Sequence, residues 1–175
     1  MNGTFSKTEK RNVGFTLLEL LLYVGIISML MVVLVLFVSS VASARIKSQA
    51  ISEVESQGMQ ALYQITQAVR NAEGINAPSV GSAASSLSLA MADASKNPTV
   101  FDVFEGAIRM QEGTNSQVIL LNSRVEVSGF TVENISRLGT PGITRIQFVL
   151  SHQNPENEKS YEYQQSFYGS SAIRQ

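Results

Sequence analysis

The sequence predicts an α+β fold, in which a long N-terminal α-helix packs with its second half on an antiparallel β-sheet. Three observations lead to this prediction. Residues 20–44 are mostly apolar and carry no charge. Residues 51–72 continue with apolar or small residues spaced three and four apart, as in an amphipathic helix. Beyond about residue 86 the apolar period changes from 3.6 to 2, which is typical of strands with one buried face.

The uncharged run at residues 20–44 is long enough to cross a membrane. A bilayer core of roughly 30 Å needs about 20 apolar residues in a helix, whereas a secretory signal has an apolar core of only about 7–15 residues. Lys7, Lys10 and Arg11 precede the run, and cationic residues on that side favour a cytoplasmic N-terminus. We therefore expect a single-pass anchor in the cytoplasmic (inner) membrane, with its N-terminus inside.

Glu19 is the exception in this apolar segment, because it is an acidic residue just before the uncharged run. A carboxylate that reaches the centre of a bilayer costs about 2.5–3.5 kcal/mol on insertion scales. Two explanations fit. Glu19 lies close enough to the interface to stay hydrated, or it has a cationic partner inside an assembly.

The residues around Glu19 resemble a known signal. The stretch Gly14-Phe15-Thr16-Leu17-Leu18-Glu19-Leu20-Leu21 follows a basic leader and is similar to the cleavage and methylation motif of type IV prepilins. The resemblance implies that residues 1–14 are a leader peptide, cut off between Gly14 and Phe15 by a prepilin peptidase. It also implies methylation of Phe15 and an assembly role for Glu19, whose carboxylate would pair with the N-terminal amine of a neighbouring subunit.

The helix is expected to continue from about residue 15 to residue 73. Its first half, residues 15–44, would be the transmembrane or assembly half, and residues 45–73 would belong to a periplasmic or extracellular domain at 45–175. Gly74 is a natural C-terminal cap and Pro78 prevents the helix from resuming. The stripe expected to face the core is Ile51, Val54, Gly58, Ala61, Ile65, Ala68 and Ala72, widened by Leu62 and Val69.

Residues 74–99 are expected to form a loop, because this stretch is rich in Pro, Gly, Ser and Ala. The sheet is expected at about 100–168. Glu105-Gly106 predicts a tight turn, and Gly113 ends the following strand. The alternation slips at Ser128-Gly129, which predicts a β-bulge. The expected alternating sets are Leu87, Leu89 and Met91; Phe101 and Val103; Ile108 and Met110; Val125 and Val127; Ile146, Phe148 and Leu150; and Tyr161, Tyr163 and Phe167.

The strand order is also similar to that of the minor pseudopilin J and minor pilin W type. The shared features are Phe101–Val103, Gly106, Ile108–Met110 and Gly113, followed by the Leu-rich and Val-rich stretch 120–132. Together with the absence of Cys, which removes the disulfide-bounded loop of many major pilins, this favours a minor subunit.

Composition argues against several other functions. The chain has no Cys and one His, His152, so disulfides, thiol catalysis and Cys-based zinc sites are excluded. No catalytic residue, metal site or cofactor is predicted. The net charge of −1 and the lack of a basic stripe argue against nucleic-acid binding. Asn154, Glu156, Asn157 and Glu158 offer oxygen ligands for Ca²⁺ but lack the spacing of an EF-hand loop, so a solvated loop is favoured.

Two functions of different classes follow. The first is a non-enzymatic minor pilin or pseudopilin, a subunit of a type IV pilus, a type II secretion pseudopilus or a DNA-uptake pilus. Its partners would be other subunits, contacted through the N-terminal helix, together with the prepilin peptidase and the cytoplasmic membrane. The alternative is a signal-anchored membrane protein with an extracytoplasmic ligand-binding domain. A plain signal anchor has no use for Gly14 or Glu19, so these two residues discriminate between the functions.

Overall fold

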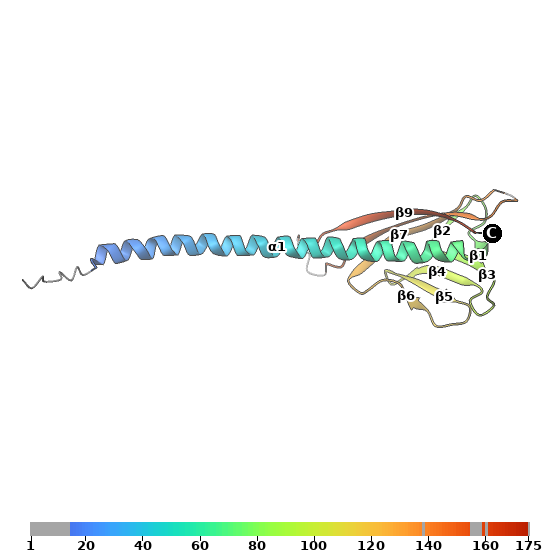
Figure 1. Cartoon of the computed structure of the whole chain (residues 1–175), viewed down its shortest axis with the longest axis horizontal. Helices are drawn as coiled ribbons and strands as arrows, with labels where there is room; N and C mark the ends of the chain where they lie inside the picture. Colours follow the sequence, from blue (N-terminus) through green and yellow to red (C-terminus); the bar gives the residue numbers. More distant parts are fainter. Residues whose placement is uncertain (1–14, 138, 155–158, 160, 175) are drawn as a thin grey trace, which may run out of the picture. The chain divides into compact units, whose positions relative to one another are not determined.

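The structure is a computed structural model that describes residues 15–137, 139–154, 159 and 161–174. The chain divides into two units, Met1–Ala42 and Ser43–Gln175. The boundary lies inside a single helix, α1 (Leu17–Arg70). Strands β1 to β9 all follow α1 in the sequence and belong to the second unit (Figure 1). The α+β class predicted from the sequence is confirmed.

The strands form two antiparallel sheets rather than the one that the sequence predicted. The first has the order β1-β3-β4-β5-β6, and the second has the order β2-β7-β8-β9. Their bounds are β1 Ala72–Ala77, β2 Ala83–Ala84, β3 Leu87–Met91, β4 Thr99–Phe104, β5 Ala107–Glu112, β6 Val118–Ile119, β7 Val125–Asn134, β8 Ile143–His152 and β9 Gln164–Ala172.

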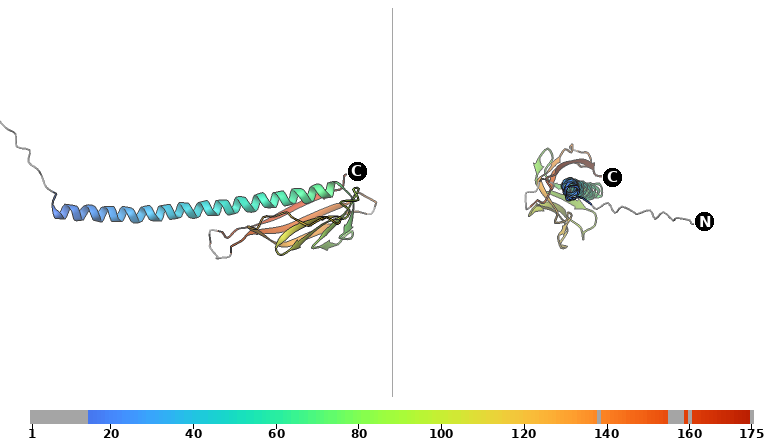
Figure 2. Two further views of the ribbon diagram at one scale, coloured as in Figure 1. Left: turned by 90° about the horizontal axis from the view of Figure 1, so that it is seen from below. Right: turned by 90° about the vertical axis from the view of Figure 1, so that its left-hand side faces the viewer.

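One core joins the two sheets to the C-terminal part of α1. The buried helix residues are Ala50, Val54, Gly58, Ala61, Ile65 and Val69, spaced three or four apart as predicted. The stripe begins at Ala50 rather than at the predicted Ile51, and Ala68 is only partly buried. Val54, Ala61, Ile65 and Val69 share one core with Leu87, Phe101 and Ile108 of the first sheet and with Val132, Ile146 and Phe148 of the second. Figure 2 shows the strands gathered around this stretch of helix. Burying the apolar face of each sheet against one helix is what closes the domain.

Two local predictions are confirmed. Phe104 pairs with Ala107, so Glu105 and Gly106 form a two-residue hairpin turn between β4 and β5. Their φ angles are 49° and 72°, the positive values that this tight turn requires. The pairing of β7 with β8 shifts register between Ser128 and Thr131. This is the predicted bulge, and it lets both halves of β7 keep their apolar side chains on the core side.

The segment 74–99 is not the loop that its composition predicted. It contains most of β1 and all of β2 and β3. The helix ends at Arg70 instead of residue 73, because residues 72–77 pair with β3. Gly74 therefore lies in a strand next to a register shift and does not cap the helix. Pairing with β3 supplies the backbone groups of β1 with hydrogen-bond partners in place of those that a longer helix would have given. Likewise, Tyr161 and Tyr163 precede β9 and are not part of it.

Candidate assembly site in the N-terminal segment

The helix α1 begins with a side-chain cap at Thr16. The Thr16 hydroxyl oxygen accepts a hydrogen bond of 3.3 Å from the backbone N–H of Glu19, and the Thr16 carbonyl accepts one of 3.2 Å from Leu20 N–H. Thr16 is thus the N-cap, and Glu19 occupies the third helical position. A Thr followed three residues later by a Glu is the pattern of a capping box. The cap fixes Glu19 in the first turn, where the positive end of the helix dipole favours a carboxylate.

The carboxylate of Glu19 has a polar neighbour one turn further along the helix. The Tyr23 hydroxyl donates to Glu19 Oε1 at 3.4 Å, as four-residue spacing on a helix permits. The Tyr23 ring lies 5.9 Å from the ring of Phe15, centroid to centroid, at an interplanar angle of 59°. Phe15, Glu19 and Tyr23 therefore form one cluster at the start of α1. We call these three residues the N-terminal cluster.

Beyond this cluster, α1 presents apolar side chains on every side. The large apolar residues exposed between positions 20 and 41 are Leu20, Leu21, Leu22, Val24, Ile26, Ile27, Met29, Leu30, Met31, Val32, Val33, Leu34, Val35, Leu36, Phe37, Val38 and Val41. The Ser28 hydroxyl in this stretch donates to the Val24 carbonyl at 2.7 Å, so its polarity is satisfied within the helix. A helix that is apolar all round requires an apolar environment.

Length and composition make α1 the one helix in the described part of the chain that is able to cross a membrane. Residues 1–14 lie outside the described residues, so neither the predicted leader nor Gly14 at the predicted cleavage site is described. Phe15 is described, lies just before the helix, and is 71% exposed.

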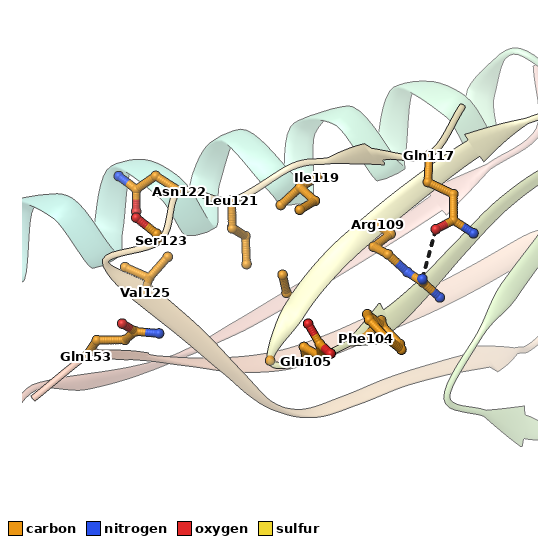
Figure 3. Close-up of a pocket in the computed structure, with 12 residues that line it drawn as sticks. Phe104, Glu105, Arg109, Gln117, Ile119, Leu121, Asn122, Ser123, Val125 and Gln153 are labelled. Carbon is orange, nitrogen blue, oxygen red and sulfur yellow. Dashed lines mark hydrogen bonds between the residues drawn. The ribbon is translucent and has the colours of Figure 1, made fainter. Parts of the chain in front are cut away.

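A second candidate region is a groove of about 450 Å³ in the globular unit. No pattern in the sequence predicts this groove. The turn between β4 and β5, strand β6 and the loop before β7 line it, and Phe104, Arg109, Ile119 and Leu121 contribute side chains (Figure 3). The groove is mostly apolar, and Arg109 is the cation at its rim. The lining is assembled by the pairing of β5 with β4 and with β6 and by the loop before β7, with Gln153 added from just beyond the end of β8, so no single local pattern predicts it.

Arg109 is held firmly in this groove. Its Nε and Nη2 donate to the two carboxylate oxygens of Asp102 at 2.9 and 2.6 Å, and Nη1 donates to Gln117 Oε1 at 2.8 Å. The guanidinium also lies 4.4 Å from the centroid of the Phe104 ring, in cation–π range. The hydrogen bonding of the Arg109 guanidinium to the Asp102 carboxylate raises the pKa of Arg109 above its ordinary value. Because Asp102 already balances its charge, Arg109 offers an anionic ligand only a weakened field.

The other polar candidates are the possible metal ligands and His152. Among the described residues, no group of three or more His, Asp or Glu side chains is placed to hold a metal ion. In the oxygen-rich stretch considered for Ca²⁺, residues 156–158 lie outside the described residues. The imidazole of His152 stacks on Tyr161 at 5.3 Å between ring centroids, and its Nδ1 lies 2.8 Å from the Gln153 carbonyl. Both contacts of His152 are therefore made to residues close to it in the sequence.

The sequence predicts functional roles for Phe15 and Glu19, and the structure adds Thr16 and Tyr23 as their neighbours. The signal for Thr16 was present as the Thr-x-x-Glu spacing, and the signal for Tyr23 was its position four residues after Glu19. Comparison of the chain with protein-family models, with curated proteins and with solved structures found no match.

Proposed function

We propose that this chain is a minor pilin or pseudopilin, a structural subunit rather than an enzyme. The apolar part of α1 holds it in the cytoplasmic membrane, a prepilin peptidase cuts between Gly14 and Phe15, and the N-terminal helix then docks it among other subunits. A type IV pilus, a type II secretion pseudopilus and a DNA-uptake pilus all use subunits of this kind. The α+β architecture, with strands covering the second half of one long helix, supports a pilin-like fold.

The observation that carries this proposal is the position of Glu19. It is an acidic residue in the first turn of a helix whose next 20 or so residues are apolar and exposed. A carboxylate in an apolar environment is costly unless a cation lies next to it. Cleavage after Gly14 creates such a cation, because the new N-terminus at Phe15 is an amine four residues before Glu19.

The amine can reach Glu19 in two ways. Within one helix, the two groups lie on neighbouring turns. Between subunits displaced along a fibre axis, the Glu19 carboxylate of one chain meets the amine of its neighbour. The second arrangement explains why an assembly subunit keeps a residue that costs stability in the membrane, since the charge pair forms only when subunits are correctly docked.

The processing step is tested by mass spectrometry. Full-length chain produced together with a prepilin peptidase should yield a product that begins at Phe15, with or without N-methylation. Gly14→Val should block the cut, because a bulky side chain at the junction would obstruct the peptidase. A wild-type chain that retains Met1 in the presence of active peptidase would overturn this part of the proposal.

The assembly role is tested by Glu19→Leu. Insertion and cleavage should remain intact, and incorporation into filaments or into a minor-subunit complex should fall. The measurement compares the amount in the membrane fraction with the amount in sheared filaments. The matched control exchanges two neighbours, combining Glu19→Leu with Leu20→Glu. It keeps the charge in the same turn but moves it about 100° around the helix. Incorporation equal to wild type in Glu19→Leu would contradict the proposal.

The groove beside Arg109 favours the alternative, a signal-anchored protein with an extracytoplasmic ligand-binding domain. That function needs neither a cut after Gly14 nor a carboxylate at position 19. It would leave both variants above without effect, while substitutions in the groove, such as Ile119→Glu, would abolish its activity. The two functions therefore make opposite predictions for the same two N-terminal substitutions.

A further inference from the structure

The two sheets end in four edge strands: β1 and β6 in the first sheet, and β2 and β9 in the second. An edge strand presents a row of unpaired N–H and C=O groups to which another chain can add a strand. Natural sheets guard their edges by keeping them short, by placing charges or Pro on them, or by interrupting them with bulges.

Three of the four edges have such protection. Strands β2 and β6 are two residues long. Strand β1 is longer, but its pairing with β3 contains two register shifts and it carries the charged residue Glu73. None of these three edges offers a long, regular template to a foreign strand.

Strand β9 has no such protection. It is nine residues long, from Gln164 to Ala172, and contains neither a charged residue nor a Pro. Its pairing with β8 is regular from Ser151↔Gln164 to Ile143↔Ala172. Within the described parts of the chain, no hydrogen bond joins its outer backbone groups to another segment. At about 3.4 Å per residue, β9 offers an open edge of roughly 30 Å.

The side chains of β9 favour an uncharged partner. One face is anchored, because Phe167 and Ser171 are buried and the Ser171 hydroxyl donates to the Thr66 carbonyl of α1 at 3.1 Å. The opposite face is exposed, and Tyr168 at its middle is 63% exposed. The exposed positions are Gln164, Ser166, Tyr168, Ser170 and Ala172, all of them neutral. A rigidly held strand with a neutral outer face suits a partner strand that is itself neutral.

The direction of β9 argues against antiparallel pairing with a second copy. Positions 58, 62 and 66 of α1 meet positions 167, 169 and 171 of β9 in that order, so β9 runs parallel to this part of the helix. If two copies paired antiparallel through β9, the helix segments that begin at Ser43 would run in opposite directions in the two copies. The segments before Ser43 would then enter the two domains from opposite ends. Two subunits held by N-terminal segments in one membrane cannot easily meet that condition, whereas a different subunit can present a strand in either direction.

We propose that the outer edge of β9 pairs with an extended, uncharged segment of another subunit of the same assembly, which adds a fifth strand to the sheet β2-β7-β8-β9. The pairing rests on the proposed function, because it requires neighbouring subunits. Main-chain hydrogen bonds supply the affinity, and the exposed face around Tyr168 selects the segment.

The experiment uses the absence of Cys from the natural chain. Full-length chains with one substitution each, Ser166→Cys, Tyr168→Cys or Ser170→Cys, are labelled with a benzophenone maleimide. The labelled chains are illuminated in membranes of cells that produce the whole assembly, and mass spectrometry locates the attachment points. The control is Gln147→Cys, which is exposed on the neighbouring strand β8 and pairs directly with Tyr168.

Strand addition predicts an ordered result. All three β9 labels should attach to one short segment of a single other subunit, and the attachment point should move two residues along it with each step along β9. The label at position 147 should attach far less. Absent or unordered attachment would overturn the inference, and attachment to a second copy of this chain would overturn the choice of partner.

A second set of variants alters the edge itself while the label stays at position 168. Ser166→Lys combined with Ser170→Lys places charges beside the edge, as protected edges do, and should abolish attachment from position 168. Gln147→Lys should not. If Glu19→Leu lowers incorporation but β9 shows no ordered attachment, only this inference fails. If Glu19→Leu has no effect but ordered attachment persists, the pairing stands and the proposed assembly role of Glu19 fails.

Discussion

At the scale of single residues, Tyr23 connects the other two members of the N-terminal cluster. Its hydroxyl donates to Glu19 and its ring contacts Phe15, so it touches both residues that the proposed function uses. A hydrogen bond to a charged group contributes about 1.5–3 kcal/mol in proteins. In an apolar environment the phenol therefore lowers the cost of keeping the Glu19 carboxylate charged before an amine reaches it.

Tyr23→Phe keeps the ring and removes only the hydroxyl. We expect incorporation into the assembly to fall to a level between those of wild type and Glu19→Leu, because the carboxylate loses a donor but keeps its charge. In the Glu19→Leu background the same substitution should have no further effect, since the hydroxyl then has nothing to act on. The measurement is a double-mutant cycle on sheared-filament abundance. Equal effects in both backgrounds would show that Tyr23 acts independently of Glu19.

Thr144 makes a prediction about stability at the same scale. It is fully buried in β8, and its hydroxyl has no hydrogen-bond partner within the described residues. An unsatisfied buried polar group costs about 1–3 kcal/mol. Thr144→Val should therefore raise the free energy of unfolding by about 1 kcal/mol.

The matched control is Thr99, a buried threonine whose hydroxyl donates to the Lys96 carbonyl at 2.8 Å. Thr99→Val should lower the free energy of unfolding by about 1 kcal/mol, because a satisfied hydrogen bond is lost. Denaturant titration of the two variants should thus give shifts of opposite sign. Shifts of the same sign would mean that the Thr144 hydroxyl has a partner, such as a water molecule.

At the scale of elements, α1 meets the second sheet at Gly58 with no room for a side chain. A Cβ built on Gly58 would lie 2.0 to 2.4 Å from three ring carbons of Phe167. Glycine is therefore required here for close packing, although it weakens a helix by about 1 kcal/mol relative to alanine. The Phe167 ring in turn stacks on Phe148, with 5.3 Å between centroids, so it cannot easily move aside.

Gly58→Ala should therefore destabilise the domain, against the usual effect of this substitution in a helix. Overpacking of a well-packed core typically costs about 1–3 kcal/mol, which exceeds the gain in helix propensity. The control is Gly25→Ala, where a new Cβ would meet nothing within 4 Å. Thermal unfolding followed by circular dichroism should show a lower midpoint for Gly58→Ala only. An unchanged midpoint would mean that β9 is free to shift away from α1.

Some features of the helix and strands are encoded in local sequence patterns, and others depend on pairing between distant segments. The helix stripe from Val54 to Val69 could be predicted, because one face of a helix is encoded in local spacing. The bulge in β7 could be predicted for the same reason, since it shifts the phase of an alternating pattern. The end of α1 could not be predicted from Gly74, because pairing of β1 with β3, 15 or so residues away, decides it. Alternation identifies strands but not their partners, so the division into two sheets was also inaccessible.

The candidate functional residues also divide into those that a local pattern predicts and those that depend on how segments meet in the fold. The sequence pointed to Phe15 and Glu19 as candidates because the N-terminal cluster is local, and its members lie within about two turns of the helix start. The groove beside Arg109 could not be predicted, because it forms where β4, β5, β6 and the loop before β7 meet. The open edge of β9 is likewise a property of the sheet order, which no short segment of the sequence specifies.

At the scale of the whole molecule, the core belongs to one unit. Every core residue from Val54 to Ile173 lies beyond the boundary between Ala42 and Ser43, whereas the apolar residues before it are exposed. The hydrophobic effect therefore acts on the two units in different ways. It folds the second unit from within, and it drives the apolar part of the first into a membrane or a bundle of other helices.

This separation predicts that a truncated chain of residues 45–175 is soluble, monomeric and folded. It keeps all the residues that pack the core and loses the exposed apolar stretch at positions 20–41. Circular dichroism should show both helix and strand, and sedimentation should give a monomer, because the proposed partner of β9 is another subunit. An insoluble or unfolded product would mean that the N-terminal segment contributes to folding.

The same truncated chain allows a test of where its stability arises. Ile65 is fully buried at the centre of the helix stripe, whereas Met59 is 63% exposed on the same helix. Ile65→Asp places an unpaired carboxylate in the core, where it costs several kcal/mol, and a small domain has only about 5–15 kcal/mol in total. We therefore expect Ile65→Asp to unfold the domain and Met59→Asp to leave its unfolding midpoint nearly unchanged. Because both variants introduce the same charge into the same helix, a difference between them measures burial alone. If Ile65→Asp stayed folded, the helix would not be the element that closes the two sheets.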